Sequence, residues 1–303
     1  MEPRIFNCRL STLALQVWLF LLRQDSKLTG QQLRRLRRRN QRSKASVVTN
    51  SGPVVSITSH GDRLHTVHLV LESIASGSVL PSRLILWVDT QDALTNRSPG
   101  LQRLVKRGLE ICRTDNYGPH TKYYPYLLST DSLNSPLVTA DDDTLYCSWW
   151  LEGLVRSYKK NPTAIICYRA HLMRLASGAI APYQSWGPCK STCGSFLNFA
   201  TGVSGCIYPP SFLNELKLAG AQFLRLCPRA DDVWLHVNAV RTGFEILQVW
   251  NRPLRFPIVP GSQGSGLFLR NFNLAQNDEQ IGNTYTAADI SFLESCVAQA
   301  DPR

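Results

Sequence analysis

The sequence predicts an α/β protein built on a doubly wound, mostly parallel sheet, in a single domain with a basic N-terminal helical leader. Short apolar runs alternate with stretches of helical periodicity from residue 54 onward, which is typical of parallel strands joined by helices that cover both faces of a sheet. The length of 303 residues suits one large α/β domain. A hydrophobic content of 44% excludes a disordered or fibrous chain.

The expected elements follow one another from the first apolar run onward. We expect strands at residues 54–58, 84–88, 109–112 and 136–139, and helices at residues 64–75, 101–107, 123–129, 149–160 and 231–242. The Gly- and Pro-containing segment 183–205 is expected to be a loop. We see no break in composition within residues 54–270, so we divide the chain into a leader (1–50), one α/β domain (51–285) and a C-terminal tail (286–303).

The leader carries most of the excess positive charge. Residues 1–50 hold 11 of the 33 Lys and Arg residues but only two of the 22 acidic ones. The apolar run 10–22 has helical spacing but is shorter than the roughly 18 residues that span a bilayer. Together with the cations that follow it, this run favours a helix lying on an anionic membrane surface through residues 10–44. The alternatives are a helix packed on the body, or a nucleic-acid-binding arm, which the lack of aromatic residues among the arginines disfavours.

A triplet of carboxylates, Asp141–Asp143, directly follows the expected strand 136–139. Ligands of open α/β sheets bind at the carboxyl ends of strands, and adjacent carboxylates repel one another unless a cation neutralises them. Hard oxygen ligands suit Mg²⁺ or Mn²⁺, which commonly bridge carboxylates to a diphosphate. The alternative is a solvated acidic turn at the start of the following helix.

A second acidic pair, Asp231 and Asp232, opens the last expected helix. Either residue could serve only as a helix N-cap. His236 is four residues beyond Asp232 and shares its helical face, which makes it a candidate metal ligand or acid/base group, with a structural histidine as the alternative. Lys122 is a candidate phosphate-binding cation, or a solvated surface lysine.

Several motifs in a fixed order connect these residues over about residues 54–282. They are VVSITSHGDRLHTVHLVLESI, LILWVD, the D-x-x-G-P-x-x-K-Y pattern that ends at Tyr123, VTADDD, CPRADDVWL and NDEQ near Asp278. Together they resemble bacterial family-2-like glycosyltransferases of the GT-A fold, which have a Rossmann-like nucleotide-binding sheet. The NDEQ pattern resembles the C-terminal part of members associated with the cell envelope and capsule.

The resemblance implies a cleft for a nucleotide-sugar. Thr58 and Ser59 would line it, together with Arg63, and Asp89 would contact the base or ribose. Lys122 would approach the diphosphate or the sugar.

The resemblance also implies roles for the acidic residues. Asp141, Asp142 and Asp143 look like the DxD motif, with Asp143 in direct contact with the metal and Asp141 nearer the ribose or sugar. The candidate metal ligands are therefore Asp141, Asp143 and His236. The pair Asp231–Asp232 resembles the one that supplies the general base, and we choose Asp232.

These implications define the expected function. We expect a metal-dependent enzyme, using Mn²⁺ or Mg²⁺, that moves one sugar from a UDP- or GDP-linked donor to a glycan or lipid-linked acceptor with inversion. The basic and aromatic motif of processive members is absent, which favours single-sugar transfer. The alternatives are a metal-dependent nucleotidyl or phosphoryl transferase and a non-catalytic binder of nucleotide-sugars or lipid surfaces. We expect a cytoplasmic protein, peripheral at the inner face of the membrane, that does not bind nucleic acid.

Overall fold

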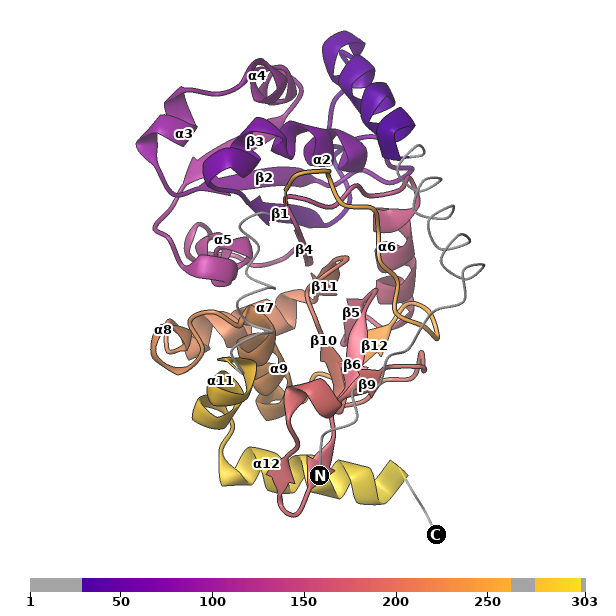
Figure 1. Ribbon diagram of the computed structural model, residues 1–303, viewed down its shortest axis with the longest axis vertical. Coiled ribbons are helices and arrows are strands. Elements are labelled where there is room, and N and C mark those ends of the chain that lie inside the picture. Colours follow the sequence, from indigo (N-terminus) through magenta and orange to yellow (C-terminus); the bar gives the residue numbers. More distant parts are fainter. Residues whose placement is uncertain (1–28, 263–275, 301–303) are drawn as a thin grey trace, which may run out of the picture.

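A computed structural model describes residues 29–262 and 276–300. Its centre is a seven-stranded sheet of order β12-β5-β11-β4-β1-β2-β3 (Figure 1). The strands of this sheet are β1 (Val54–Thr58), β2 (Arg83–Val88), β3 (Leu109–Arg113), β4 (Leu137–Ala140), β5 (Ile165–Cys167), β11 (Cys206–Tyr208) and β12 (Ile246–Gln248). Two small sheets are formed by β6 (Ala170–Leu172), β9 (Gly187–Pro188) and β10 (Asn198–Ala200), and by β7 (Leu175–Ala176) and β8 (Ala179–Ile180).

Helices connect and cover these strands. The α-helices are α2 (Val67–Ile74), α3 (Gln91–Thr95), α4 (Pro99–Val105), α5 (Tyr124–Leu128), α6 (Trp150–Lys160), α7 (Pro210–Ala219), α8 (Phe223–Leu226), α9 (Asp231–Thr242), α11 (Gln276–Thr284) and α12 (Ala287–Ala300). Three short 3-10 helices are η1 (Gly61–His65), η2 (Gly118–Lys122) and η3 (Tyr183–Ser185). A further helix runs through residues 29–42.

The sheet is mostly parallel, as predicted. β4, β1, β2 and β3 pair in parallel, and β12 pairs in parallel with β5. β11 is the exception, because it runs antiparallel between β4 and β5. The carboxyl ends of the parallel strands and the start of β11 therefore lie at one edge of the sheet, where ligands of such folds bind.

Helices pack on both faces, which makes the sheet doubly wound. Alternate residues of β1 belong to two different core clusters, Val54 to one, and Val55 and Ile57 to the other. The first cluster contains residues of α5, α7, α9, α11 and α12, and the second contains residues of α2, α4 and α6. Successive side chains of a strand point to opposite faces, so one sheet serves both layers of a single domain.

Part of the basic N-terminal segment is packed on this domain. In the helix at residues 29–42, Leu33 and Leu36 join the second core cluster. The Asn40 amide donates to the carboxylate of Glu72, on α2, and to the carbonyl of Gly100, on α4. Figure 1 shows this helix in indigo at the top, while α12, in yellow, lies at the opposite end of the molecule. Residues 287–300, expected to be a tail, thus form a helix, and its Leu293 is buried in the first cluster.

The prediction of a loop over residues 183–205 is wrong, because η3, β9 and β10 lie within it. β10 pairs with β6, and β6 with β9, in strands of two or three residues. Such strands are too short to show a period of two, and their pairing depends on distant parts of the chain. The same reason explains why β5 and β12 were not predicted.

The amphipathic helix expected at residues 10–22 lies outside the described residues. Among the helices that the structure describes, none is long and apolar enough to cross a bilayer.

Candidate active site

Most of the polar residues singled out in the sequence meet at the carboxyl edge of the central sheet. Ser59 follows β1 and Asp141 follows β4, and these two strands are neighbours in the sheet. Lys122 ends η2, and the hydroxyl of Ser56, on β1, donates to its backbone carbonyl at 2.6 Å. Asp231 and Asp232 form the first turn of α9. The site therefore draws on elements separated by more than a hundred residues in the sequence.

Asp142 fastens the end of β1 to the acidic triplet. Its carboxylate accepts hydrogen bonds from the Ser59 hydroxyl and from the Arg63 guanidinium, both at 2.7 Å. The second guanidinium nitrogen of Arg63 lies 3.5 Å from the Asp143 carboxylate. Burial lowers the pKa of Arg63, but Asp142 and Asp143 more than offset this, so its pKa is raised and the charge is firmly held. Both carboxylate oxygens of Asp142 therefore accept hydrogen bonds from protein groups.

Lys122 is the central cation of the site. Its ammonium forms an ion pair with Asp141 at 2.5 Å. Although burial lowers the pKa of Lys122, the charges of Asp141, Asp231 and Asp232 raise it well above its usual value. The Asp141 backbone N–H donates to the buried hydroxyl of Tyr146 at 2.8 Å, which fixes the start of the triplet. Lys122 therefore connects the triplet electrostatically with the acidic pair on α9.

Asp143 is 9% exposed, and its carboxylate faces the Arg63 guanidinium. Burial raises its pKa, Asp141 and Asp142 raise it further, and Arg63 and Lys122 only partly oppose this. Within the described residues, no three His, Cys, Asp or Glu side chains converge closely enough to form a metal cage. Asp141 and Asp143 do offer hard carboxylate oxygens, so the residues fit a cation that takes its other ligands from a diphosphate and water.

Asp231 and Asp232 are not helix caps, because Ala230 is the N-cap of α9 and no side chain caps the helix. Burial raises the pKa of both carboxyls. The neighbouring charge of Asp231 raises the pKa of Asp232 further, to well above the usual aspartate range, despite the opposing charge of Lys122. A carboxylate with a raised pKa in a partly buried position has the properties of a general base.

The loop Thr201–Gly205 lies directly against Asp232. Gly202 has a φ of +62°, and a Cβ at this position would lie 2.8 Å from the nearer Asp232 carboxylate oxygen. Only glycine accepts both this conformation and this close approach. The loop precedes β11, so it borders the same edge of the sheet as the acidic triplet.

His236 is not placed to bind a metal. One ring nitrogen lies 2.7 Å from the Tyr285 hydroxyl and the other 2.9 Å from the Phe196 carbonyl oxygen, so both are used within the core. Burial lowers its pKa to about 4. The prediction of His236 as a ligand is wrong, because helical spacing from Asp232 does not reveal that the side chain points away from the site.

Asp89 and Thr58 lie at the same edge but outside this cluster of charges. Asp89 accepts a hydrogen bond from the Asn116 amide at 2.8 Å, beyond the ends of β2 and β3. The Thr58 hydroxyl donates to the Trp87 carbonyl at 3.4 Å. Their contact with a nucleotide stays a prediction.

Sequence reasoning missed Arg169 and Tyr183, which lie within electrostatic reach of Asp232. Asp232 helps to raise the pKa of Tyr183, chiefly a result of burial, to about 12. It also opposes the lowering of the Arg169 pKa that burial and Arg255 cause. The position of Arg169, two residues after the buried apolar run of β5, was the available signal, because that is where ligand-binding side chains of such sheets occur.

Comparisons with known proteins give distant structural likenesses. No protein-family model matches the sequence, and no curated protein matches it. The structure is similar to that of S. aureus TarS, with 12% identity and a TM-score of 0.48 over 82% of this chain and 71% of that one, and the same values hold for TarS in complex with UDP. It is also similar to CMP:2-keto-3-deoxy-manno-octonic acid synthetase complexed with CTP, with 10% identity and a TM-score of 0.40 over 74% of this chain and 100% of that one. These likenesses are too distant to assign an activity.

Proposed function

We propose that this protein is a metal-dependent glycosyltransferase that moves one sugar from a nucleotide-diphosphate sugar to a hydroxyl acceptor. One observation carries the proposal: two separate groups of carboxylates, Asp141–Asp143 and Asp231–Asp232, meet at the carboxyl edge of the sheet with Lys122 between them. Glycosyl transfer needs both, one group to hold the donor diphosphate and one to deprotonate the acceptor. The resemblance of the motif order to family-2-like enzymes of the GT-A fold supports the same assignment.

The donor would lie along the ends of β1, β2 and β4. Ser59 and Arg63 would line its cleft, Asp89 would meet the base or ribose, and Lys122 would approach the diphosphate. Asp141 and Asp143 would bind Mn²⁺ or Mg²⁺, which as a Lewis acid stabilises the negative charge that develops on the leaving diphosphate. The Lys122 ammonium, which pairs with Asp141 in the structure, would then also interact with the donor phosphates.

Asp232 would accept the proton of the acceptor hydroxyl as that oxygen attacks the anomeric carbon. Direct attack opposite the leaving diphosphate inverts the configuration. Such proton transfer typically contributes about 10²–10⁴-fold to the rate. The raised pKa of Asp232 suits this role, because a base works best when its pKa is near the working pH.

We also propose that the enzyme works at an anionic membrane surface, on a lipid-linked or cell-envelope acceptor. The helix at residues 29–42 buries Leu33 and Leu36 against the body, and of its arginines only Arg39 forms an ion pair with the described residues of the body, through Glu72. Those that are exposed are Arg34, Arg35, Arg37, Arg38 and Arg42. A cation near such a surface contributes on the order of 1 kcal/mol.

Product analysis tests the proposed reaction. Purified protein is incubated with UDP- and GDP-sugars, Mn²⁺ and an envelope extract, and the nucleotide products are separated. Sugar transfer releases a nucleoside diphosphate. Transfer of the sugar phosphate would instead release a nucleoside monophosphate, and nucleotidyl transfer would release a sugar phosphate. We expect Asp232→Asn to lower the turnover by about 10²–10⁴-fold with donor binding retained, and the exposed control Glu215→Gln to leave it unchanged. Full activity of Asp232→Asn would exclude Asp232 as the base.

A further inference from the structure

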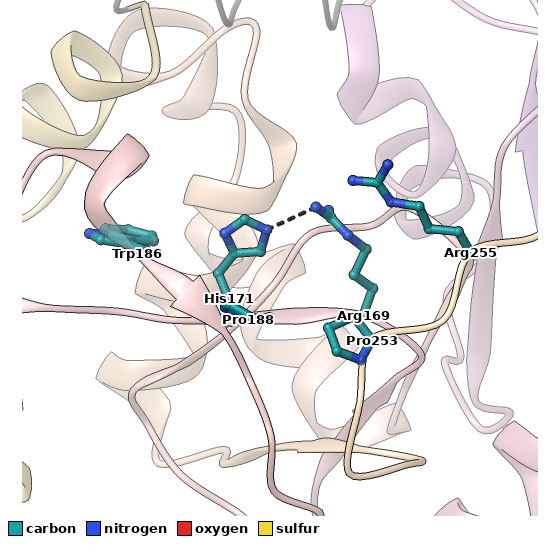
Figure 2. Close-up of a pocket in the computed structure, with 6 residues that line it drawn as sticks. All are labelled: Arg169, His171, Trp186, Pro188, Pro253 and Arg255. Carbon is teal, nitrogen blue, oxygen red and sulfur yellow. Dashed lines mark hydrogen bonds between the residues drawn. The ribbon is translucent and has the colours of Figure 1, made fainter. Parts of the chain in front are cut away.

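A second polar site lies beside the acidic pair, in a pocket of about 440 Å³. Its walls are formed by residues that follow β5, by β6 and β9, and by the segment after β12. Figure 2 shows the lining residues, Arg169, His171, Trp186, Pro188, Pro253 and Arg255. The sequence analysis did not single out the polar residues of this lining as site residues. The roles proposed for the carboxylates do not involve them.

The pocket contains two guanidinium groups and no carboxylate. Arg169 donates to the Thr201 hydroxyl at 2.8 Å and interacts with a ring nitrogen of His171 at 2.9 Å, and both partners are uncharged. No carboxylate of residues 29–262 or 276–300 forms an ion pair with Arg169 or Arg255. Asp232 only partly offsets the effect of Arg255 on Arg169, and a bound oxyanion would relieve the repulsion between the two cations.

His171 adds no charge of its own to this pocket. Burial lowers its pKa to about 4, and the charges of Arg169 and Arg255 contribute to this. At neutral pH it is therefore an uncharged ring that accepts from Arg169 and stacks on Tyr183, with ring centroids 5.5 Å apart. The hydrogen bond to Arg169, drawn as a dashed line in Figure 2, orients the guanidinium.

The pocket adjoins the proposed base rather than the proposed donor site. Arg169 bonds Thr201, and the next residue, Gly202, lies against Asp232. Lys122 and Asp141 form an ion pair with each other and interact with the acidic pair, but neither lines the pocket. A molecule that presents a hydroxyl to Asp232 would therefore extend into this pocket.

Trp186 gives the pocket part of an apolar wall. The indole N–H donates to the Ala181 carbonyl at 2.8 Å, and the ring packs edge-on against Phe199 at 5.1 Å. The side chain is buried, with 5% of its surface exposed, so it closes the pocket on this side. Pro188 and Pro253 complete the apolar part of the lining.

We propose that this pocket binds an oxyanion, a phosphate group carried by the acceptor saccharide, through Arg169 and Arg255, beside the apolar wall that includes Trp186. The acceptor would thus be a phosphorylated glycan. Its identity as an acceptor rests on the proposed glycosyl transfer, whereas the oxyanion site rests only on the arginines and the pocket.

Calorimetric titration of the full chain tests the site with inorganic phosphate, glucose 6-phosphate and glucose as probes. We expect glucose 6-phosphate to bind at least tenfold more tightly than glucose. Arg255→Gln should weaken glucose 6-phosphate and phosphate by about tenfold, because one of two guanidinium contacts is lost. The matched control is Arg252→Gln, an exposed arginine three residues away that does not line the pocket, and it should change binding less than twofold. Equal binding of glucose and glucose 6-phosphate, or equal loss in both variants, would overturn the proposal.

The donor diphosphate is the other source of such an oxyanion, and a second titration separates the two. UDP and GDP with Mn²⁺ should bind wild type and Arg255→Gln equally. A loss of nucleotide affinity in Arg255→Gln as large as the loss for glucose 6-phosphate would assign the pocket to the donor and overturn the proposal. Failure of every nucleotide to bind wild type, with the Arg255-dependent binding of glucose 6-phosphate intact, would instead contradict the proposed function and leave the oxyanion site standing.

Discussion

Asp232 lies between two charges that shift its pKa in opposite directions. Burial is the largest cause of the raised pKa of Asp232. The charge of Asp231 raises this pKa further, and the charge of Lys122 lowers it. The base must be deprotonated to act, so we expect kcat/KM to rise with pH through a pKa above the usual aspartate range. Asp231→Asn should move this rising limb to lower pH, and Lys122→Met should move it to higher pH. The pKa read from the limb belongs to the coupled pair rather than to Asp232 alone.

The measurement is a pH profile of kcat/KM for the wild type and both variants. The control Glu215→Gln removes an exposed carboxylate of α7 and should leave the limb in place. A limb that moves upward in Asp231→Asn, or that does not move in either variant, would contradict the electrostatic coupling.

Gly202 also affects the proposed base, because it lies directly against the Asp232 carboxylate. Gly202→Ala places a methyl group 2.8 Å from the Asp232 carboxylate in a backbone conformation with a φ of +62°. We expect kcat/KM to fall by about 10²-fold, since a displacement of roughly 1 Å in a catalytic group can cost this much. Gly178→Ala is the matched control, because Gly178 has a φ of +76° with no atom within 4 Å of the added Cβ. Equal activity in both variants would mean that the loop does not position Asp232.

The acidic residues of the site could be predicted because each group is contiguous and stands at a strand end or helix start. Arg169 and Arg255 could not, because they lie 86 positions apart in segments without a recognisable pattern. His236 was wrongly assigned for the related reason that helical spacing does not specify which neighbour faces the site, and here the ring lies between Tyr285 and Phe196.

At the level of elements, the strands β1 to β4 and the helices α6 and α9 could be predicted, whereas α7, α12 and the short strands were not. β1 and α9 match the expected ranges residue for residue, because both are mostly apolar runs with a polar boundary. β5, β11 and β12 have three residues each and form through pairing with one another and with β4. Their order in the sheet is a tertiary property that no local pattern contains.

The helix at residues 29–42 makes the membrane proposal testable without removing a packed element. The variant Arg34→Gln/Arg37→Gln/Arg38→Gln changes exposed side chains and leaves Leu33, Leu36 and Asn40 in place. At about 1 kcal/mol per charge, we expect binding to vesicles that contain anionic phospholipid to weaken by up to about 10²-fold at low salt. The matched control, Lys190→Gln/Arg225→Gln/Arg252→Gln, removes three exposed cations elsewhere. Cosedimentation with vesicles measures the effect, and an equal loss in both triple variants would contradict a role for this helix.

At the scale of the whole molecule, one sheet edge unites the proposed donor side, the proposed base and the proposed acceptor side. Strand order places Asp141–Asp143 beside Ser59, and the antiparallel β11 brings the Thr201–Gly205 loop to the same edge. The first arrangement could be predicted from the expected parallel sheet, because the carboxyl ends of parallel strands lie at the same edge. The second could not be predicted, because it depends on a strand of reversed direction.

The most direct test of the central claim, a metal-dependent donor site at Asp141–Asp143, is thermal unfolding with UDP- and GDP-sugars, with and without Mn²⁺. A ligand that binds only the folded state at about 100 times its Kd stabilises it by about 2.7 kcal/mol. We expect one nucleotide class to raise Tm only with Mn²⁺, and we expect this gain to be lost in Asp143→Asn but kept in the exposed control Asp131→Asn. Stabilisation that persists without metal and in Asp143→Asn, or no stabilisation of wild type by any nucleotide-sugar, would contradict the claim.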